Sequence, residues 1–246
     1  MAILDRIDEG AIARLTLNSP GNLNALSDAM LAALQAEFDL LAQDRSIRVV
    51  TIMGAGKAFC AGHDLKEMTA GRQAEDGGRA YFADLFARCA RMMTTIRALH
   101  QPVIAAPHGI ATAAGCRFGV NGVNIGLFCS TPMVALSRNI PRKQAFEMLT
   151  TGHFIDTTRA AELGLINRAV PAEDLETETM ALAQTVAAKL GSAVRIGKRA
   201  FYEQLEMGLE AAYAHTGAVM VENMLDRDTA EGIAAFIDKR APDWDQ

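Results

Sequence analysis

The stretch AFCAGHDLKEM, residues 58–68, contains the residue types and spacing best suited to chemistry. Two very small residues, Ala61 and Gly62, come directly before His63 and Asp64, after an apolar stretch and a GAGK sequence. Small residues let another molecule approach the backbone closely, and amides at a turn that enters a helix point outward, with the positive end of the helix dipole behind them. Such amides suit the stabilisation of an oxyanion.

A second run of small residues follows another apolar stretch. After PVIAA comes PHGIATAAGC, in which Ala111, Ala113, Ala114 and Gly115 again leave the backbone uncovered. One amide from each turn could converge on a single oxygen. Because small residues also permit tight packing, each turn taken alone fits a structural interpretation as well.

The elements that must position these turns alternate between strand and helix up to about Ala106, which indicates a layered α/β core. Ser27 can cap a helix, and a second helix is expected over residues 79–99. The apolar stripe of the first helix consists of Met30, Leu34, Phe38 and Leu41. The expected strands are residues 2–8, 11–18, 47–53 and 102–106.

Beyond Pro141 the pattern is mostly helical. It predicts helices over 141–152 and 157–164, a short strand at LINRAV (165–170), and long helices from about Glu173 to Arg240. We therefore divide the chain into an α/β core, residues 1–170, and a C-terminal helical region, residues 171–246.

Composition excludes several classes of protein. The chain has 246 residues, half of them hydrophobic, and a formal net charge of -5 with scattered Lys and Arg, so a role in nucleic-acid binding is not expected. No apolar run approaches the length that spans a bilayer, and no leader is evident, which predicts a soluble cytoplasmic protein. Four widely spaced cysteines indicate neither a disulfide framework nor a zinc site, and nothing calls for a metal or redox cofactor.

Several sequence blocks together resemble the enoyl-CoA hydratase/isomerase, or crotonase, family. In order they are NLNAL, AFCAGHDLKEM, PVIAAPHGIATAAGC, FGVNGVNIGLF, AFEMLTTG, AAELGLINRAVP and FIDKRAP. They span nearly the whole chain, and NGVNIGLFCSTP with PRKQAFEML most resembles one branch of the family. The resemblance implies a crotonase-like spiral core of ββα units with a C-terminal helical trimerisation region.

The resemblance also implies a site. The family binds acyl-CoA thioesters as substrates and holds the thioester oxygen between two backbone amides, which here match His63 and Ala114. Lys239, which matches a lysine near the C-terminus of family members, would reach CoA from a neighbouring subunit of a homotrimer or a dimer of trimers. The implied CoA-binding residues are Asn24, Ala25, Leu26, Ala61, Gly62, Asp64, Leu65, Lys66, Phe236 and Lys239.

Two departures from the family pattern bear on the chemistry. Hydratases of the family use two glutamates to activate water, and the matching positions here are Arg117 and Gly122, neither of which can shuttle a proton. The family also has roughly a dozen more residues, including a core strand, between Cys116 and Phe118. Either that deletion is real, or the printed sequence omits a segment.

Other groups near the turns could act, but each also has a structural interpretation. The His63 ring could transfer a proton or merely contact CoA, Asp64 could cap a helix, and Glu67 could orient His63 or face solvent. Cys129 lacks an evident activating neighbour. Two functions stay open: an acyl-CoA enzyme that resembles hydratase lyases or isomerases, and a catalytically inactive acyl-CoA-binding or assembly subunit.

Overall fold

The main sheet of the computed structural model lies in the N-terminal half of the chain; the structure describes residues 2–109 and 115–244. Its strands are β1 (Leu4–Glu9), β2 (Ile12–Leu17), β3 (Val49–Gly54) and β4 (Val103–Ala105), in that spatial order. β1 is antiparallel to β2, whereas β2, β3 and β4 are parallel. The four strands expected from apolar patterning are confirmed.

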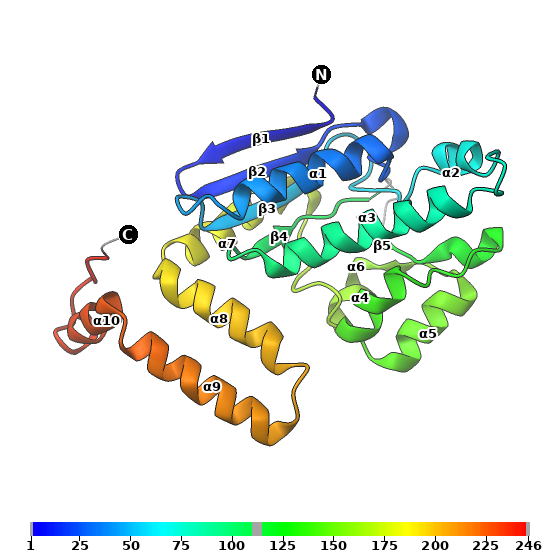
Figure 1. Ribbon diagram of the computed structural model, residues 1–246. Helices are drawn as coiled ribbons and strands as arrows, with labels where there is room; N and C mark the ends of the chain where they lie inside the picture. The colour runs from blue at the N-terminus through cyan, green and yellow to red at the C-terminus, as the bar shows by residue number, and fades with distance from the viewer. Residues whose placement is uncertain (1, 110–114, 245–246) are drawn as a thin grey trace.

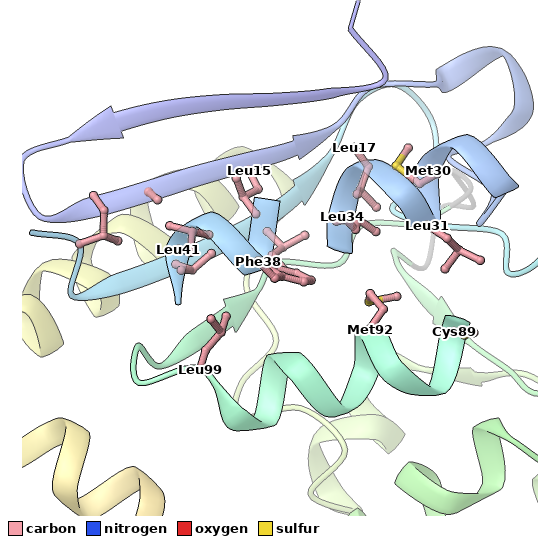
Figure 2. Packing of buried hydrophobic residues seen from close by; sticks show 14 of the residues in the cluster. Leu15, Leu17, Met30, Leu31, Leu34, Phe38, Leu41, Cys89, Met92 and Leu99 are labelled. Atoms are coloured by element: carbon pink, nitrogen blue, oxygen red, sulfur yellow. The ribbon is translucent and has the colours of Figure 1, made fainter. Parts of the chain in front are cut away.

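One face of the sheet is covered by α1 (Asp28–Leu41), with α3 (Arg79–Ala98) packed against α1 (Figure 1). The predicted stripe of α1 is buried, and Figure 2 shows Phe38 and Leu34 between the sheet and Met92 of α3. The Ser27 hydroxyl accepts a hydrogen bond from the backbone N–H of Met30 at 3.2 Å, so the predicted cap is confirmed.

The other face of the sheet is covered by α7 (Leu175–Ala187). Ala183 packs there with Ile12 of β2 and Val49 of β3. Side chains alternate between the two faces of a strand, so the neighbouring Ala13 and Val50 join the α1 side instead. This two-sided burial explains why the central strands read as nearly continuous apolar runs.

The remaining elements before α7 are short. They are η1 (Pro20–Asn22), α2 (Leu65–Gly71), β5 (Arg117–Phe118), η2 (Asn121–Ile125), α4 (Pro132–Asn139), α5 (Arg142–Thr151), β6 (Ile155–Asp156), α6 (Thr157–Glu162) and η3 (Ala172–Asp174). β5 pairs with β6 in a separate two-stranded sheet. Within the described residues, the chain after Cys116 therefore adds no strand beside β4.

The strand predicted at LINRAV is wrong. The backbone N–H groups of Leu165 and Ile166 both point to the carbonyl oxygen of Ala160 and close the end of α6. Because these amides are used in the helix terminus, they are not available to a strand ladder.

The C-terminal helices form an arm that leaves the sheet. The arm consists of α8 (Gly191–Gln204), the antiparallel α9 (Leu209–Met224) and α10 (Arg227–Ile237), as Figure 1 shows. Large apolar side chains on the arm are exposed, among them Leu209, Tyr213, Leu225 and Phe236. In the described part of the chain, no helix combines the length and hydropathy needed to cross a bilayer.

Candidate functional site

The turn at residues 60–64 joins the end of β3 to the start of α2. Gly62 adopts a φ of +91°, a left-handed conformation that favours glycine, and a Cβ added there would meet no atom within 4 Å. The N–H of Ala61 donates to the carbonyl of Leu23, and the N–H of Gly62 approaches the Cys60 sulfur at 3.4 Å. The hydrogen bond of Ala61 therefore anchors the turn to Leu23, while the Cβ position of Gly62 is left uncovered.

The NLNAL segment lies alongside this turn. The N–H of Leu26 donates to the carbonyl of Gly62 at 2.7 Å, and Leu26 forms a parallel bridge with His63. Two segments for which the family resemblance implies CoA binding are thus adjacent in space.

Asn24 is completely buried and fastens the segment to the loop after β3. Its side-chain N–H groups donate to the carbonyls of Ala55 and Ala58, both at 2.8 Å, while its Oδ1 accepts from the N–H of Ser19 at 2.8 Å. The donors and the acceptor of the Asn24 side chain are therefore all engaged by other groups of the protein. The neighbouring Ala25 is also buried, so these two predicted CoA-binding residues offer a ligand no exposed side chain.

His63 is half-buried at the open side of the turn. Its ring meets Phe86 edge-on, with 5.7 Å between centroids, and its Nδ1 is buried without a hydrogen-bond partner. Burial lowers the pKa of the imidazole below its ordinary value, which favours the neutral ring at neutral pH. The backbone N–H of His63 has no acceptor among the described residues.

The acidic residues beside His63 stabilise helix ends. The Asp64 carboxylate accepts from the N–H groups of Lys66 and Glu67 and caps α2, as expected. Glu67 accepts from the N–H of Asp28 at 2.7 Å at the first turn of α1, so neither proposed role for it, orienting His63 or facing solvent, is correct. Sequence patterning missed this contact because the two residues are distant in the chain.

The second turn is described only at its edges, and Ala114, the predicted second amide donor, lies outside the described residues. The segment before it is tied to the first turn, because the N–H of Phe59 donates to the carbonyl of His108 at 2.8 Å. The His108 ring also contacts the carbonyl of Gly56 at 3.1 Å. Both predicted turns therefore start from one hydrogen-bonded pair of segments.

The positions of the family's two glutamates hold no carboxylate. Arg117 is exposed, with its guanidinium 5.1 Å from the centre of the Phe154 ring. Gly122 is closely packed, since a Cβ there would lie 2.4 Å from the carbonyl oxygen of Leu127 and 2.8 Å from the Cys129 sulfur. The backbone around Gly122 thus leaves no room for a side chain.

The remaining predicted CoA-binding residues lie at the surface in two places. Leu65 and Lys66 are exposed at the start of α2, next to the turn. Phe236 and Lys239 are exposed at α10, which Figure 1 places at the opposite end of the molecule from α2. Within one chain, the arm residues are therefore not part of the site at the turn. Among the described residues, no group of His, Cys, Asp and Glu is arranged to hold a metal ion.

Comparison with known proteins identifies the family. The sequence model of the enoyl-CoA hydratase/isomerase family matches residues 8–246. The chain belongs to this family. It is 43% identical to the mitochondrial enoyl-CoA hydratase domain-containing protein 3 of Xenopus laevis, over 96% of this chain and 84% of that protein.

Solved structures agree with this assignment. An enoyl-CoA hydratase of Mycobacterium smegmatis superposes with a TM-score of 0.92 at 48% identity, covering 99% of both chains. Human enoyl-CoA hydratase domain-containing protein 3 superposes with a TM-score of 0.92 at 39% identity, covering 98% of this chain and 100% of that one. The crotonase fold and the resemblance to the domain-containing protein 3 branch are thus confirmed.

The frog alignment runs over 251 positions, although this chain has only 246 residues, so the relative carries residues within the aligned range that this chain lacks.

Proposed function

We propose that this protein binds an acyl-CoA thioester at the turn of residues 60–64 and stabilises the enolate form of the thioester. The observation that carries the proposal is the backbone N–H of His63, which has no acceptor among the described residues and follows the open Gly62. An enolate places negative charge on the carbonyl oxygen, and a fixed amide stabilises that charge with little reorganisation. Ala114 would supply the second amide, as the family resemblance implies.

The chemistry that follows enolate formation differs from that of a two-glutamate hydratase. Neither Arg117 nor Gly122 can move a proton, and the carboxylates of Asp64 and Glu67 are engaged by helix N–H groups. The His63 ring, whose pKa is lowered by burial, belongs to the same residue as the proposed amide donor and could act as a neutral base. We therefore propose a lyase or isomerase of the family in which the glutamate pair takes no part.

The second candidate function is a catalytically inactive acyl-CoA-binding or assembly subunit. The absence of carboxylates at positions 117 and 122 favours it. Both functions require the same ligand, with coenzyme A entering as part of the substrate and no separate cofactor.

Assembly would complete the groove. The exposed apolar side chains of the arm support a homotrimer or a dimer of trimers, in which Phe236 and Lys239 of one subunit contact the CoA bound by another. Light scattering after size-exclusion chromatography measures the assembly directly. The expectation of a cytoplasmic protein stays a prediction, since the frog relative is named as mitochondrial.

Two measurements on the same preparation test the proposal. Loss of absorbance by crotonyl-CoA reports hydration of the double bond, and calorimetric titration with acetyl-CoA reports binding. Turnover supports the enzyme, and binding without turnover supports the inactive subunit. If the protein neither binds nor converts either thioester, both candidate functions are refuted.

A further inference from the structure

A row of aromatic side chains begins at the 60–64 turn. The His63 ring meets Phe86 of α3 edge-on, with 5.7 Å between the ring centroids and 77° between the ring planes. Phe86 in turn stacks with Phe82, at 6.4 Å and 20°. Residues four apart share one face of a helix, so the two phenylalanines stand side by side on α3. His63, Phe86 and Phe82, here called the aromatic row, thus lead away from the residue that supplies the proposed amide donor.

The aromatic row keeps part of its surface accessible. All three side chains are half-buried. Phe86 packs against the main core on one side, whereas Phe82 lies beyond that core cluster. Apolar surface that stays in contact with water favours a ligand that covers it. The row therefore offers an apolar wall directly beside the proposed thioester site.

The far part of the row is fixed by the packing of α2 (Leu65–Gly71) on the start of α3 (Figure 1). A Cβ added at Gly71 would lie 2.3 Å from the Tyr81 ring, which itself meets Phe82 edge-on at 5.5 Å. A Cβ added at Gly78 would lie 2.8 Å from the Phe82 ring. The N–H of Gly78 also donates to the Asp76 carboxylate at 2.9 Å. The Phe82 ring is thus held in place before any ligand binds.

The row ends at a positive charge. The guanidinium of Arg72 lies 5.7 Å from the centre of the Phe82 ring, within the range of a cation–π contact. Arg72 is exposed, so this end of the row faces water. The apolar wall therefore extends over Phe86 and Phe82 and then stops.

The acyl tail is the part of an acyl-CoA that matches this wall. Its first carbon carries the thioester oxygen, which the proposed site places at the backbone N–H of His63. The coenzyme A portion is polar and charged, whereas the tail is apolar. Each methylene that becomes fully buried strengthens binding about fourfold. A tail that runs along the row would gain affinity with each carbon until it reaches Arg72.

We propose that Phe86 and Phe82 form the wall that binds the acyl tail, and that the substrate is the thioester of an apolar acid of medium chain length. The inference rests on the proposed acyl-CoA site at the turn. It adds the substrate class and names Phe82 as a residue that determines chain-length specificity. An acetyl group is too short to cover both rings, whereas a hexanoyl or octanoyl tail extends beyond His63.

The test is calorimetric titration of the intact protein with acetyl-CoA, hexanoyl-CoA and octanoyl-CoA, which are saturated and cannot be hydrated. Hexanoyl-CoA should bind about tenfold or more tightly than acetyl-CoA, since the half-buried wall covers part of each added methylene. In Phe82→Ala this ratio of affinities should fall about threefold or more. Phe82→Leu keeps an apolar side chain and should retain most of the ratio. The matched control Phe146→Ala removes an exposed phenylalanine of α5 and should leave the ratio unchanged.

The outcomes separate this inference from the proposed function. If none of the three thioesters binds, the acyl-CoA site itself is refuted, and the tail wall with it. If acetyl-CoA binds and the longer thioesters bind no more tightly, the acyl-CoA site stands and the tail wall is refuted. The tail wall is also refuted if Phe82→Ala keeps the full ratio, or if Phe146→Ala lowers it equally. Thermal unfolding of each variant verifies folding, which should persist because Phe82 lies outside the main core cluster.

Discussion

The backbone N–H of Leu26 donates to the carbonyl oxygen of Gly62 at 2.7 Å, and this bond fixes the peptide that leads into His63. The carbonyl of Gly62 points toward the NLNAL segment, so the N–H of the same peptide, which belongs to His63, points the other way. Because the peptide is planar, the hydrogen bond between Leu26 and Gly62 also sets the direction of the His63 N–H, which is the potential catalytic donor.

Substitution of Gly62 by alanine should disturb this orientation. At a φ of +91° an L-residue is strained by about 1–2 kcal/mol, although no neighbouring atom would obstruct the methyl group. Relief of the strain would rotate the 62–63 peptide, and loss of one oxyanion donor lowers kcat about 10²–10³-fold. We expect weak turnover of any thioester substrate in a protein that remains folded, measured by kinetics and thermal unfolding.

Two controls accompany Gly62→Ala. Gly197→Ala, in the exposed part of α8, should be neutral or slightly stabilising because alanine favours helix. His63→Ala retains the backbone amide, so equal losses in His63→Ala and Gly62→Ala would show that the ring, rather than the amide, carries the function.

Asn24 should be a principal determinant of stability at the site. Asn24→Ala removes one acceptor and two donors from a fully buried position and leaves the Ala55 and Ala58 carbonyls without their partner. We expect the free energy of unfolding to fall by about 3 kcal/mol, as determined by denaturant titration. Asn139→Ala removes an exposed hydrogen bond and should change it by no more than about 0.5 kcal/mol. Equal effects of the two substitutions would contradict the role of Asn24 in holding the NLNAL segment to the loop after β3.

Local patterns in the sequence predicted the main sheet, α1, α3 and the caps at Ser27 and Asp64. Each of these depends on residues close together in the chain, where strand alternation, helix periodicity and cap chemistry operate. The contact of Glu67 with the N–H of Asp28 was not predictable in this way, since it exists only once α2 lies against the start of α1.

Two further features were not predicted correctly from the sequence, in each case for a physical reason. LINRAV has the composition of a strand, but its first amides close α6. A cavity lined by Arg45, His100 and Arg195 was not predicted, because its lining residues come from loops and helix ends that are separate in sequence and meet only near the amino ends of β3 and β4.

Introducing glutamate at Gly122 should not restore a hydratase. The added Cβ would lie 2.4 Å from the backbone carbonyl oxygen of Leu127, so the backbone would have to shift to accept it. Gly122→Glu should therefore lower the free energy of unfolding by about 1–3 kcal/mol and yield no gain in crotonyl-CoA hydration. Gly122→Ala should cost nearly as much, because the Cβ itself clashes, whereas Gly21→Ala, where nothing lies within 4 Å, should be close to neutral. Active, stable Gly122→Glu protein would refute this account.

Lys198 should make stability depend on pH in the alkaline range. Its Nζ donates to the carbonyls of Ile96 at 3.0 Å and Gln101 at 2.7 Å, and burial lowers its pKa from 10.5 to about 8. Below pH 8 both the folded and the unfolded protein carry the charge, and the folded protein bears the full cost of burying it. Between pH 8 and 10.5 the unfolded chain binds more protons, so this residue's contribution to stability rises with pH.

The variant Lys198→Met isolates this contribution. At pH 7 it should be less stable by about 1–2 kcal/mol, because the two carbonyls lose their donor. Denaturant titrations from pH 7 to 10 should show the difference between the original protein and the variant growing as pH rises, while cysteine and tyrosine ionisation is common to both proteins. The exposed Lys143→Met serves as the control and should give a difference that does not vary with pH. A difference for Lys198→Met that stays constant across the range would mean that the two carbonyls hold the pKa of Lys198 near its ordinary value, since hydrogen bonds to the charged amine oppose the effect of burial.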